Sequence, residues 1–158
     1  IEGFQNTSGW NGINSLPREI SLSQDLTLEQ CVPEEFEALR TGEKISVEDS
    51  FVLKSGTLEI EVEFPESTEG SVGIGNNVVT INKENLEIEN QKIPLEKGKG
   101  HKLHIYVDKS VMEVFIDGHE TFTAMLVPVT GNVEVSKSGK EIKVNVYELD
   151  AKDLYSRF

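Results

Sequence analysis

The chain is poor in cysteine: its 158 residues include only one, Cys31. A single thiol forms neither an internal disulfide nor a cluster of thiolate metal ligands. Cys31 lies in the alternating stretch Leu28-Glu29-Gln30-Cys31-Val32, and no activating partner is nearby in the sequence. This position predicts a buried structural thiol rather than a catalytic nucleophile.

Basic residues are also few, with 15 lysines and arginines against 28 acidic residues and a formal net charge of −13. Such a charge repels nucleic acids and anionic membrane surfaces at long range. Lys97, Lys99 and Lys102 lie close together, but Glu96 adjoins them and no aromatic residue is interleaved. No apolar run approaches the roughly 18–20 residues that a membrane helix needs. We therefore expect no nucleic-acid partner and no membrane association.

The sequence has no residue pattern typical of a catalytic or metal site. A retaining glycosidase needs two carboxyl groups about 5–5.5 Å apart, one of them kept protonated by an apolar setting. His101 and His104 are three apart on an expected strand, so they face opposite sides and do not chelate one metal ion. His119 is expected in a solvated loop. Five acidic residues are expected on the solvated faces of strands: Glu59, Glu61, Glu63, Glu87 and Glu89. We expect no catalytic residue, no metal and no cofactor in this chain.

Alternation of apolar and polar residues is the dominant pattern. Leu58–Phe64 alternates apolar with acidic side chains throughout, and Ile142, Val144 and Val146 point one way in the stretch 141–149. Successive side chains of a strand point to opposite faces, so each segment has one dry face and one solvated face. Turn signals recur at short spacing; Asp117-Gly118, for example, is typical of a two-residue hairpin turn. Roughly ten short strands joined by hairpins predict an all-β fold, a two-sheet antiparallel β-sandwich.

One segment, Pro33–Arg40, has the pattern of a short helix. Proline suits the first position, acidic residues favour the first turn, and Thr41-Gly42 ends the segment. A helix this short is not stable alone. We therefore expect one helical turn at the surface, held in place by Phe36 and Leu39.

Aromatic residues make up only 7% of the chain. Carbohydrate-binding modules usually present flat rings to the sugar, and the candidates here do not fall at alternate positions of one strand: Trp10, Tyr106, Tyr147 and Tyr155. Tyr106 and Tyr147 are better explained as cross-strand packing partners. An autonomous fructan-binding or carbohydrate-binding module stays open as the alternative function.

Two segments of the chain resemble a known family. The first is Gly9-Trp10-Asn11-Gly12-Ile13-Asn14-Ser15-Leu16-Pro17-Arg18-Glu19-Ile20-Ser21-Leu22, followed by Leu28-Glu29-Gln30 and Val32-Pro33-Glu34. The second runs from Leu103 to Gly118, LHIYVDKSVMEVFIDG, with Val111 where the family usually has a second serine. In this order they resemble the C-terminal domain of glycoside hydrolase family 32, whose members include invertases, levanases, inulinases and sucrose-6-phosphate hydrolases.

The resemblance implies a concanavalin-like jelly-roll sandwich that follows an N-terminal five-bladed propeller. It also implies that the active site lies in the propeller, on WMNDPNG, RDP and Glu-Cys motifs that do not occur in this sequence. We therefore expect a non-catalytic domain that starts just past the propeller of a β-fructosidase. Residues 1–15 would be the connecting segment and residues 16–158 the sandwich. The parent's substrate, and whether it is cytoplasmic or secreted, stay open.

We expect the sandwich to stabilise the propeller by covering one flank, and a homodimer is a further possible assembly. The predicted interdomain contact residues are Trp10, Arg18, Glu19, Glu113 and Phe115. Arg18 and Glu19 alternate along a strand, so only one of them faces the partner domain. Arg18, a bidentate donor, is the stronger candidate. The alternative is that both residues are solvated or paired within the chain. Both faces of 111–116 carry apolar residues, which predicts a strand covered on one face by something outside the two sheets.

Overall fold

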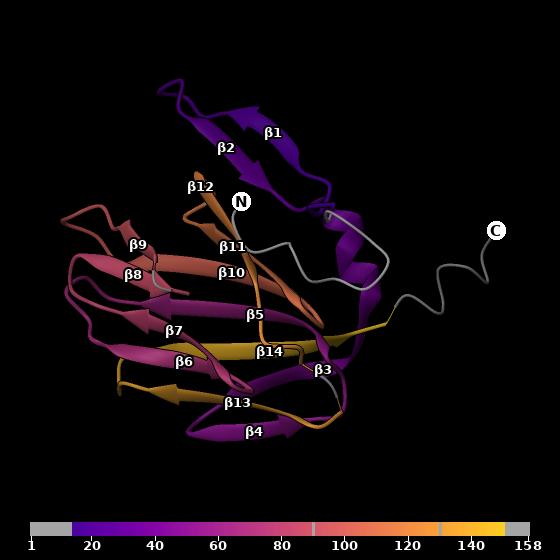
Figure 1. Ribbon diagram of the computed structural model, residues 1–158. Helices are drawn as coiled ribbons and strands as arrows, with labels where there is room; N and C mark the ends of the chain where they lie inside the picture. Colours follow the sequence, from indigo (N-terminus) through magenta and orange to yellow (C-terminus); the bar gives the residue numbers. More distant parts are fainter. Residues whose placement is uncertain (1–13, 90, 130, 151–158) are drawn as a thin grey trace.

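The computed structural model describes residues 14–89, 91–129 and 131–150. Nearly all of the elements are antiparallel strands, arranged as two six-stranded sheets and a separate two-stranded hairpin (Figure 1). This confirms the predicted all-β sandwich. The described residues contain no helix long and apolar enough to cross a membrane.

The first sheet, here called sheet one, has the strand order β12-β11-β10-β5-β14-β3. In that order its strands are Glu120–Met125, Val111–Ile116, His101–Asp108, Thr57–Phe64, Lys143–Leu149 and Arg40–Val47. The second, sheet two, has the order β4-β13-β6-β7-β8-β9. Its strands are Ser50–Leu53, Val133–Ser138, Gly70–Ile74, Asn77–Ile81, Asn85–Ile88 and Gln91–Pro94. With the hairpin this gives fourteen strands in the described part of the chain, against the roughly ten expected.

The core lies between the two sheets and is built from the apolar positions of the alternating strands. Leu58, Ile60 and Val62 of β5 are each 0% exposed, and Ile142 and Val146 match them at the end of the chain. Leu103, Ile105 and Val107 of β10 face the same core, and this inward face also carries His101, which is buried against Asp117. His104 lies on the opposite, outer face, as the three-residue spacing predicts.

The turn between β11 and β12 differs from the expectation. The register pairs Ile116 with Glu120, so the turn has three residues, 117–119, and not two. Asp117 and Gly118 both have positive φ, at 53° and 75°. Two successive residues in the left-handed region, followed by His119, form a hairpin loop of three residues. The dipeptide therefore marked the turn correctly but not its length.

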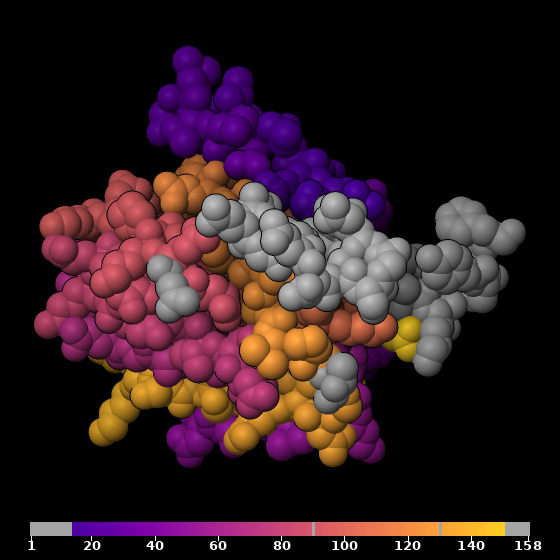
Figure 2. All heavy atoms as spheres, in the orientation of Figure 1, coloured from indigo at the N-terminus to yellow at the C-terminus, as the bar shows by residue number. Residues whose placement is uncertain are grey.

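Residues 14–39 lie outside both sheets. The hairpin consists of β1 (Glu19–Leu22) and β2 (Leu28–Cys31), and a 3-10 helix follows at Glu34–Leu39. Figures 1 and 2 show the hairpin standing out from the body of the sandwich. The 3-10 helix occupies the segment predicted to be helical. Its Phe36 and Leu39 pack on a small second core of Tyr106, Phe115 and Leu149, which confirms how the helix is held.

The 3-10 helix and Leu16 cover part of the outer face of sheet one, the face turned away from sheet two. β11 pairs with strands on both sides, and its outward residues Glu113 and Phe115 are only 3% and 4% exposed. The expectation that something outside the two sheets covers this strand is therefore confirmed. The cover comes from the chain's own residues before β3. The proposed division at residue 15 stays a prediction.

Candidate functional site

Two of the five residues predicted to make interdomain contacts lie on the outer face of sheet one, and two more lie at the base of the hairpin. Glu113 and Phe115 lie on β11, Arg18 precedes β1, and Glu19 is the first residue of β1. Trp10 lies outside the described residues. Arg18, Glu113 and Phe115 come together in space, whereas Glu19 alternates with Arg18 and is exposed.

Arg18 joins the base of the hairpin to sheet one. Its Nη2 lies 3.0 Å from Oε2 of the buried Glu113, and its Nη1 donates to Thr121 Oγ1 at 2.7 Å. The guanidinium also stands 5.5 Å from the centre of the Phe115 ring. The Leu16 backbone N–H donates to the other Glu113 oxygen at 2.5 Å. Arg18 thus pairs within the chain, the alternative left open above, while an additional interdomain role stays a prediction.

A second polar cluster lies beside it, around Glu59 of β5. Arg40 donates to both Glu59 oxygens, from Nε and Nη2, at 2.7 Å each. The His104 ring donates to Glu59 Oε1 from Nε2 at 2.5 Å, and the Tyr106 hydroxyl lies 3.4 Å from the same oxygen. Arg40 also stacks 4.1 Å from the centre of the Tyr147 ring. The cluster thereby links four neighbouring strands, β3, β14, β5 and β10.

The position of Glu59 corrects the prediction that its side chain is solvated. It does point to the outer face, but it is only 1% exposed because Arg40 and the two flanking tyrosines cover it. Burial alone opposes ionisation of this carboxyl group. The hydrogen bonds from Arg40 and His104 outweigh burial and lower its pKa to about 2. Burial raises the pKa of the neighbouring Tyr106 hydroxyl, so this group stays protonated.

This arrangement is unsuited to glycosidic acid catalysis. A general acid needs a carboxyl group whose pKa is raised, so that it holds a proton near neutral pH. Glu59 is the sheltered carboxylate of the cluster, and its pKa moves in the opposite direction. Its chemistry is that of a buried, charge-balanced structural cluster.

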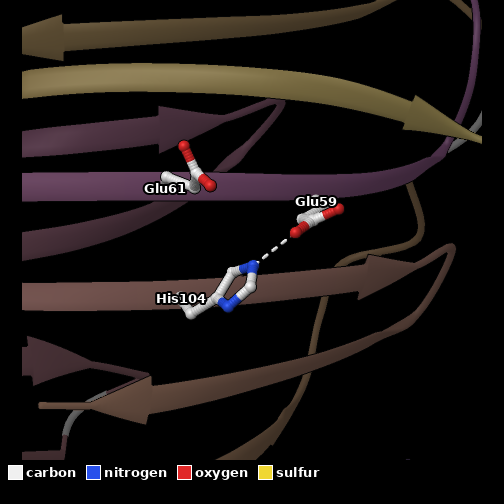
Figure 3. A group of neighbouring side chains, drawn as sticks. All are labelled: Glu59, Glu61 and His104. Atoms are coloured by element: carbon white, nitrogen blue, oxygen red, sulfur yellow. Dashed lines mark hydrogen bonds and ion pairs between the residues drawn. The ribbon is translucent and has the colours of Figure 1, made fainter. Parts of the chain in front are cut away.

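Glu59, Glu61 and His104 also have the composition of a metal site, with one ligand atom from each within 4.8 Å of the others (Figure 3). The contacts already present do not fit an ion. The Arg40 guanidinium holds both oxygens of Glu59, and His104 Nε2 is used on the same carboxylate. A cation at this point would lie beside a fixed positive charge. The expectation of no metal stays a prediction.

Comparison with known proteins shows which family the chain resembles. Residues 76–153 match the model of the C-terminal domain of family 32 glycosyl hydrolases. The chain is 28% identical to a sucrose-6-phosphate hydrolase of Lactococcus lactis subsp. lactis over 150 residues, 87% of the chain and 32% of that protein. It is equally identical to the Bacillus subtilis protein of the same name, over 89% of the chain and 34% of the relative. The chain belongs to glycoside hydrolase family 32, as its C-terminal domain.

Solved structures agree on the fold of this family 32 domain. The sucrose-6-phosphate hydrolase of Lactobacillus gasseri superimposes with a TM-score of 0.70 at 15% identity, over 85% of the chain and 33% of that structure. An exo-inulinase of Aspergillus awamori gives 0.67 at 17% identity, over 91% and 37%. The chain therefore spans about a third of the length of the relatives that it matches.

The family 32 domain carries its one cysteine in an unexpected setting. Cys31 is exposed at the end of β2, which corrects the prediction of a buried thiol. The alternation around Cys31 does mark a strand, but this strand belongs to the projecting hairpin, where neither face is part of the main core. Sequence reasoning also missed Arg40 and Glu59, which are 19 residues apart and carry no local motif.

Proposed function

We propose that this domain is the non-catalytic C-terminal part of a β-fructosidase, and that it stabilises an N-terminal catalytic domain by docking onto it. Membership of family 32 supports this proposal, as does the fact that the relatives are about three times as long as this chain. The resemblance implies a five-bladed propeller as the docking partner. The hairpin provides the main structural argument.

One face of the hairpin is apolar and exposed. Register pairs Leu22 with Leu28 and Ile20 with Gln30, so these four side chains share a face. Ile20, Leu22 and Leu28 are 67%, 63% and 47% exposed, and Leu26 at the tip is 77% exposed. Clustered exposed apolar residues of this kind mark interaction sites on soluble proteins.

The same face is anchored to the sandwich at its base. Gln30 donates from Nε2 to the His119 carbonyl and accepts from Arg18, which itself binds Glu113. Leu22 and Leu28 lie farther along the hairpin than this anchor, and Figure 2 shows the hairpin projecting from the body of the sandwich. A partner domain seated against it would extend a contact that the chain already begins. Burying Ile20, Leu22 and Leu28 against the partner domain would contribute about 1–2 kcal/mol for each side chain.

Docking is tested by the melting temperature of the N-terminal domain, measured alone and joined to this chain. We expect the joined protein to melt at a higher temperature, and Ile20→Ser with Leu22→Ser to remove part of the gain. Val78→Ser is the matched control, because Val78 is 49% exposed on sheet two, away from the hairpin. An equal effect of the control, or no gain on joining, would refute docking through the hairpin.

The non-catalytic role has a direct test. The pure chain should release no fructose from sucrose, inulin or levan, because Glu59, the sheltered carboxyl group of the polar cluster, has a lowered pKa. Measurable release from the chain alone would overturn this part of the proposal. The homodimer is tested separately by sedimentation. Self-association that disappears with the hairpin serines would assign the hairpin to a second copy rather than to the propeller.

A further inference from the structure

A cavity of about 540 Å³ lies on the outer face of sheet one, at the foot of the hairpin. Its wall includes Gln30 and Val32 of the hairpin segment, and its floor is made by strands of sheet one. The volume is in the range of roughly 300–1,000 Å³ that is typical of small-ligand sites. The cavity shares Gln30 with the hairpin face and His104 with the Glu59 cluster, but the exposed apolar residues of that face, Ile20, Leu22 and Leu28, are not among its lining residues.

The floor is a single row of side chains across four strands. Register places Phe115 opposite His104, His104 opposite Glu61, and Glu61 opposite Asn145. These partners belong to β11, β10, β5 and β14, which are adjacent in sheet one. Directly opposite side chains lie about 4.5–5.5 Å apart. One ligand the size of a sugar unit therefore reaches several of them at once.

Three members of this row keep hydrogen-bonding capacity. Glu61 has a distant ion pair, 3.9 Å from Arg40, and its side chain is 37% exposed. Asn145 accepts from Ser46 through Oδ1, which leaves its amide hydrogens as donors. His104 uses Nε2 on Glu59, which leaves Nδ1 as an acceptor in the neutral ring. The row thus offers two neighbouring acceptors, Glu61 and His104 Nδ1, and a donor beside them, the amide of Asn145.

The charges at the rim of the cavity are balanced. Lys102 lies 2.9 Å from Glu63, and Lys99 lies 3.6 Å from Asp117. Both lysines are therefore occupied, which disfavours an anionic ligand. The floor adds the Glu61 carboxylate to these balanced pairs, which also disfavours an anion. The mixed set of donors and acceptors matches hydroxyl groups, each of which both donates and accepts.

We propose that this cavity binds a neutral saccharide, with Glu61 and His104 Nδ1 accepting from sugar hydroxyls and Asn145 donating to one. Phe115 lies at the end of the row. The inference is independent of the docking role, because it requires neither the apolar face of the hairpin nor a second domain.

The test is a titration of the isotope-labelled 158-residue chain, followed by backbone amide shifts in NMR spectra. The probes are sucrose, an inulin-type trisaccharide and, as an anion, inorganic phosphate. We expect saturable shifts with a saccharide, centred on Glu61, His104 and Asn145. Glu61→Gln should weaken binding about tenfold, by loss of a charge-assisted hydrogen bond.

Two variants guard against misinterpretation. Glu87→Gln is the matched control, since Glu87 is equally exposed but lies on sheet two. Asn145→Ala is a second site variant and should also weaken binding. The inference is overturned if neither saccharide gives saturable shifts, if only phosphate does, or if Glu87→Gln weakens binding as much as Glu61→Gln.

Discussion

Replacing Arg40 by methionine tests whether the Glu59 cluster is a buried, charge-balanced unit. The substitution keeps a long side chain but removes two hydrogen bonds of 2.7 Å to a carboxylate that is 1% exposed. Removing one partner of a buried pair typically costs about 3–5 kcal/mol, because the other charge stays uncompensated. For a domain of this size the loss corresponds to a fall of about 6–20 °C in melting temperature.

The lowered pKa of Glu59, which reflects the same contacts, gives a second magnitude. A shift from 4.5 in the unfolded chain to about 2 in the folded one corresponds to about 3 kcal/mol of stability. Since the folded pKa is the lower one, this stability is fully present above the unfolded pKa of 4.5. It is lost as the pH falls toward the folded value. Without Arg40, burial dominates and raises the pKa of Glu59, so the cost of the substitution should shrink in acid.

Urea denaturation at about pH 7 and about pH 4 measures both effects. Lys92→Met is the control, because Lys92 pairs with Glu87 at 2.8 Å but is 70% exposed, and should cost less than about 1 kcal/mol. Adding Glu59→Leu to Arg40→Met should restore much of the lost stability, since apolar replacement of a buried pair is often neutral. The reasoning is refuted if Arg40→Met costs no more than Lys92→Met, or costs the same at both pH values.

Three further expectations concern packing and exposure. Gly70→Ala should destabilise the chain by about 1–3 kcal/mol in urea, because a Cβ there would lie 2.0 Å from the Ser138 carbonyl oxygen; an unchanged midpoint would contradict the close approach of β6 to β13. Ile60→Ala should cost about 2–5 kcal/mol, since Ile60 is fully buried between the sheets, whereas Ile20→Ala should leave the isolated chain within about 0.5 kcal/mol. Cys31 should react with a thiol reagent at the same rate in the folded and the unfolded chain, because its side chain is exposed. Slower reaction in the folded chain, with the difference lost in denaturant, would contradict the exposed position of Cys31.

The strands and the core were predictable because alternation reports directly which side chains share a face. Leu58–Phe64 shows this: its apolar positions are all in the core, as their period of two requires. The short helical segment was predictable for a similar local reason, since proline, acidic residues and a following glycine mark its ends. Its two apolar residues identify the side that packs.

The environment of the outer face could not be predicted from the same pattern. Alternation assigns Glu59 to the face away from the core, but it does not say what covers that face. Arg40, Tyr106 and Tyr147 reach Glu59 only through the order of strands in sheet one. Cys31 was misjudged for the converse reason, because the pattern predicts a strand without revealing that the strand stands apart from the sandwich.

The family resemblance rested on segments that proved to have structural roles within the chain. Arg18 of the Leu16-Pro17-Arg18-Glu19 block binds Glu113 of the second resembling segment, 95 residues away. The two most informative stretches of sequence are thus in direct contact. Their pairing explains why the motifs predicted the fold well and gave less information about a partner.

The projecting hairpin has a consequence for how the domain behaves by itself. Two strands alone are marginally stable, so Arg18 and Gln30 hold in place a surface that attracts other apolar surfaces. The net charge of −13 keeps separate copies apart in dilute buffer near neutral pH. Added salt screens that repulsion, and acid near the isoelectric point of about 4.6 removes it. Solubility of the lone domain therefore depends on the balance between the exposed apolar face of the hairpin and the strongly acidic net charge.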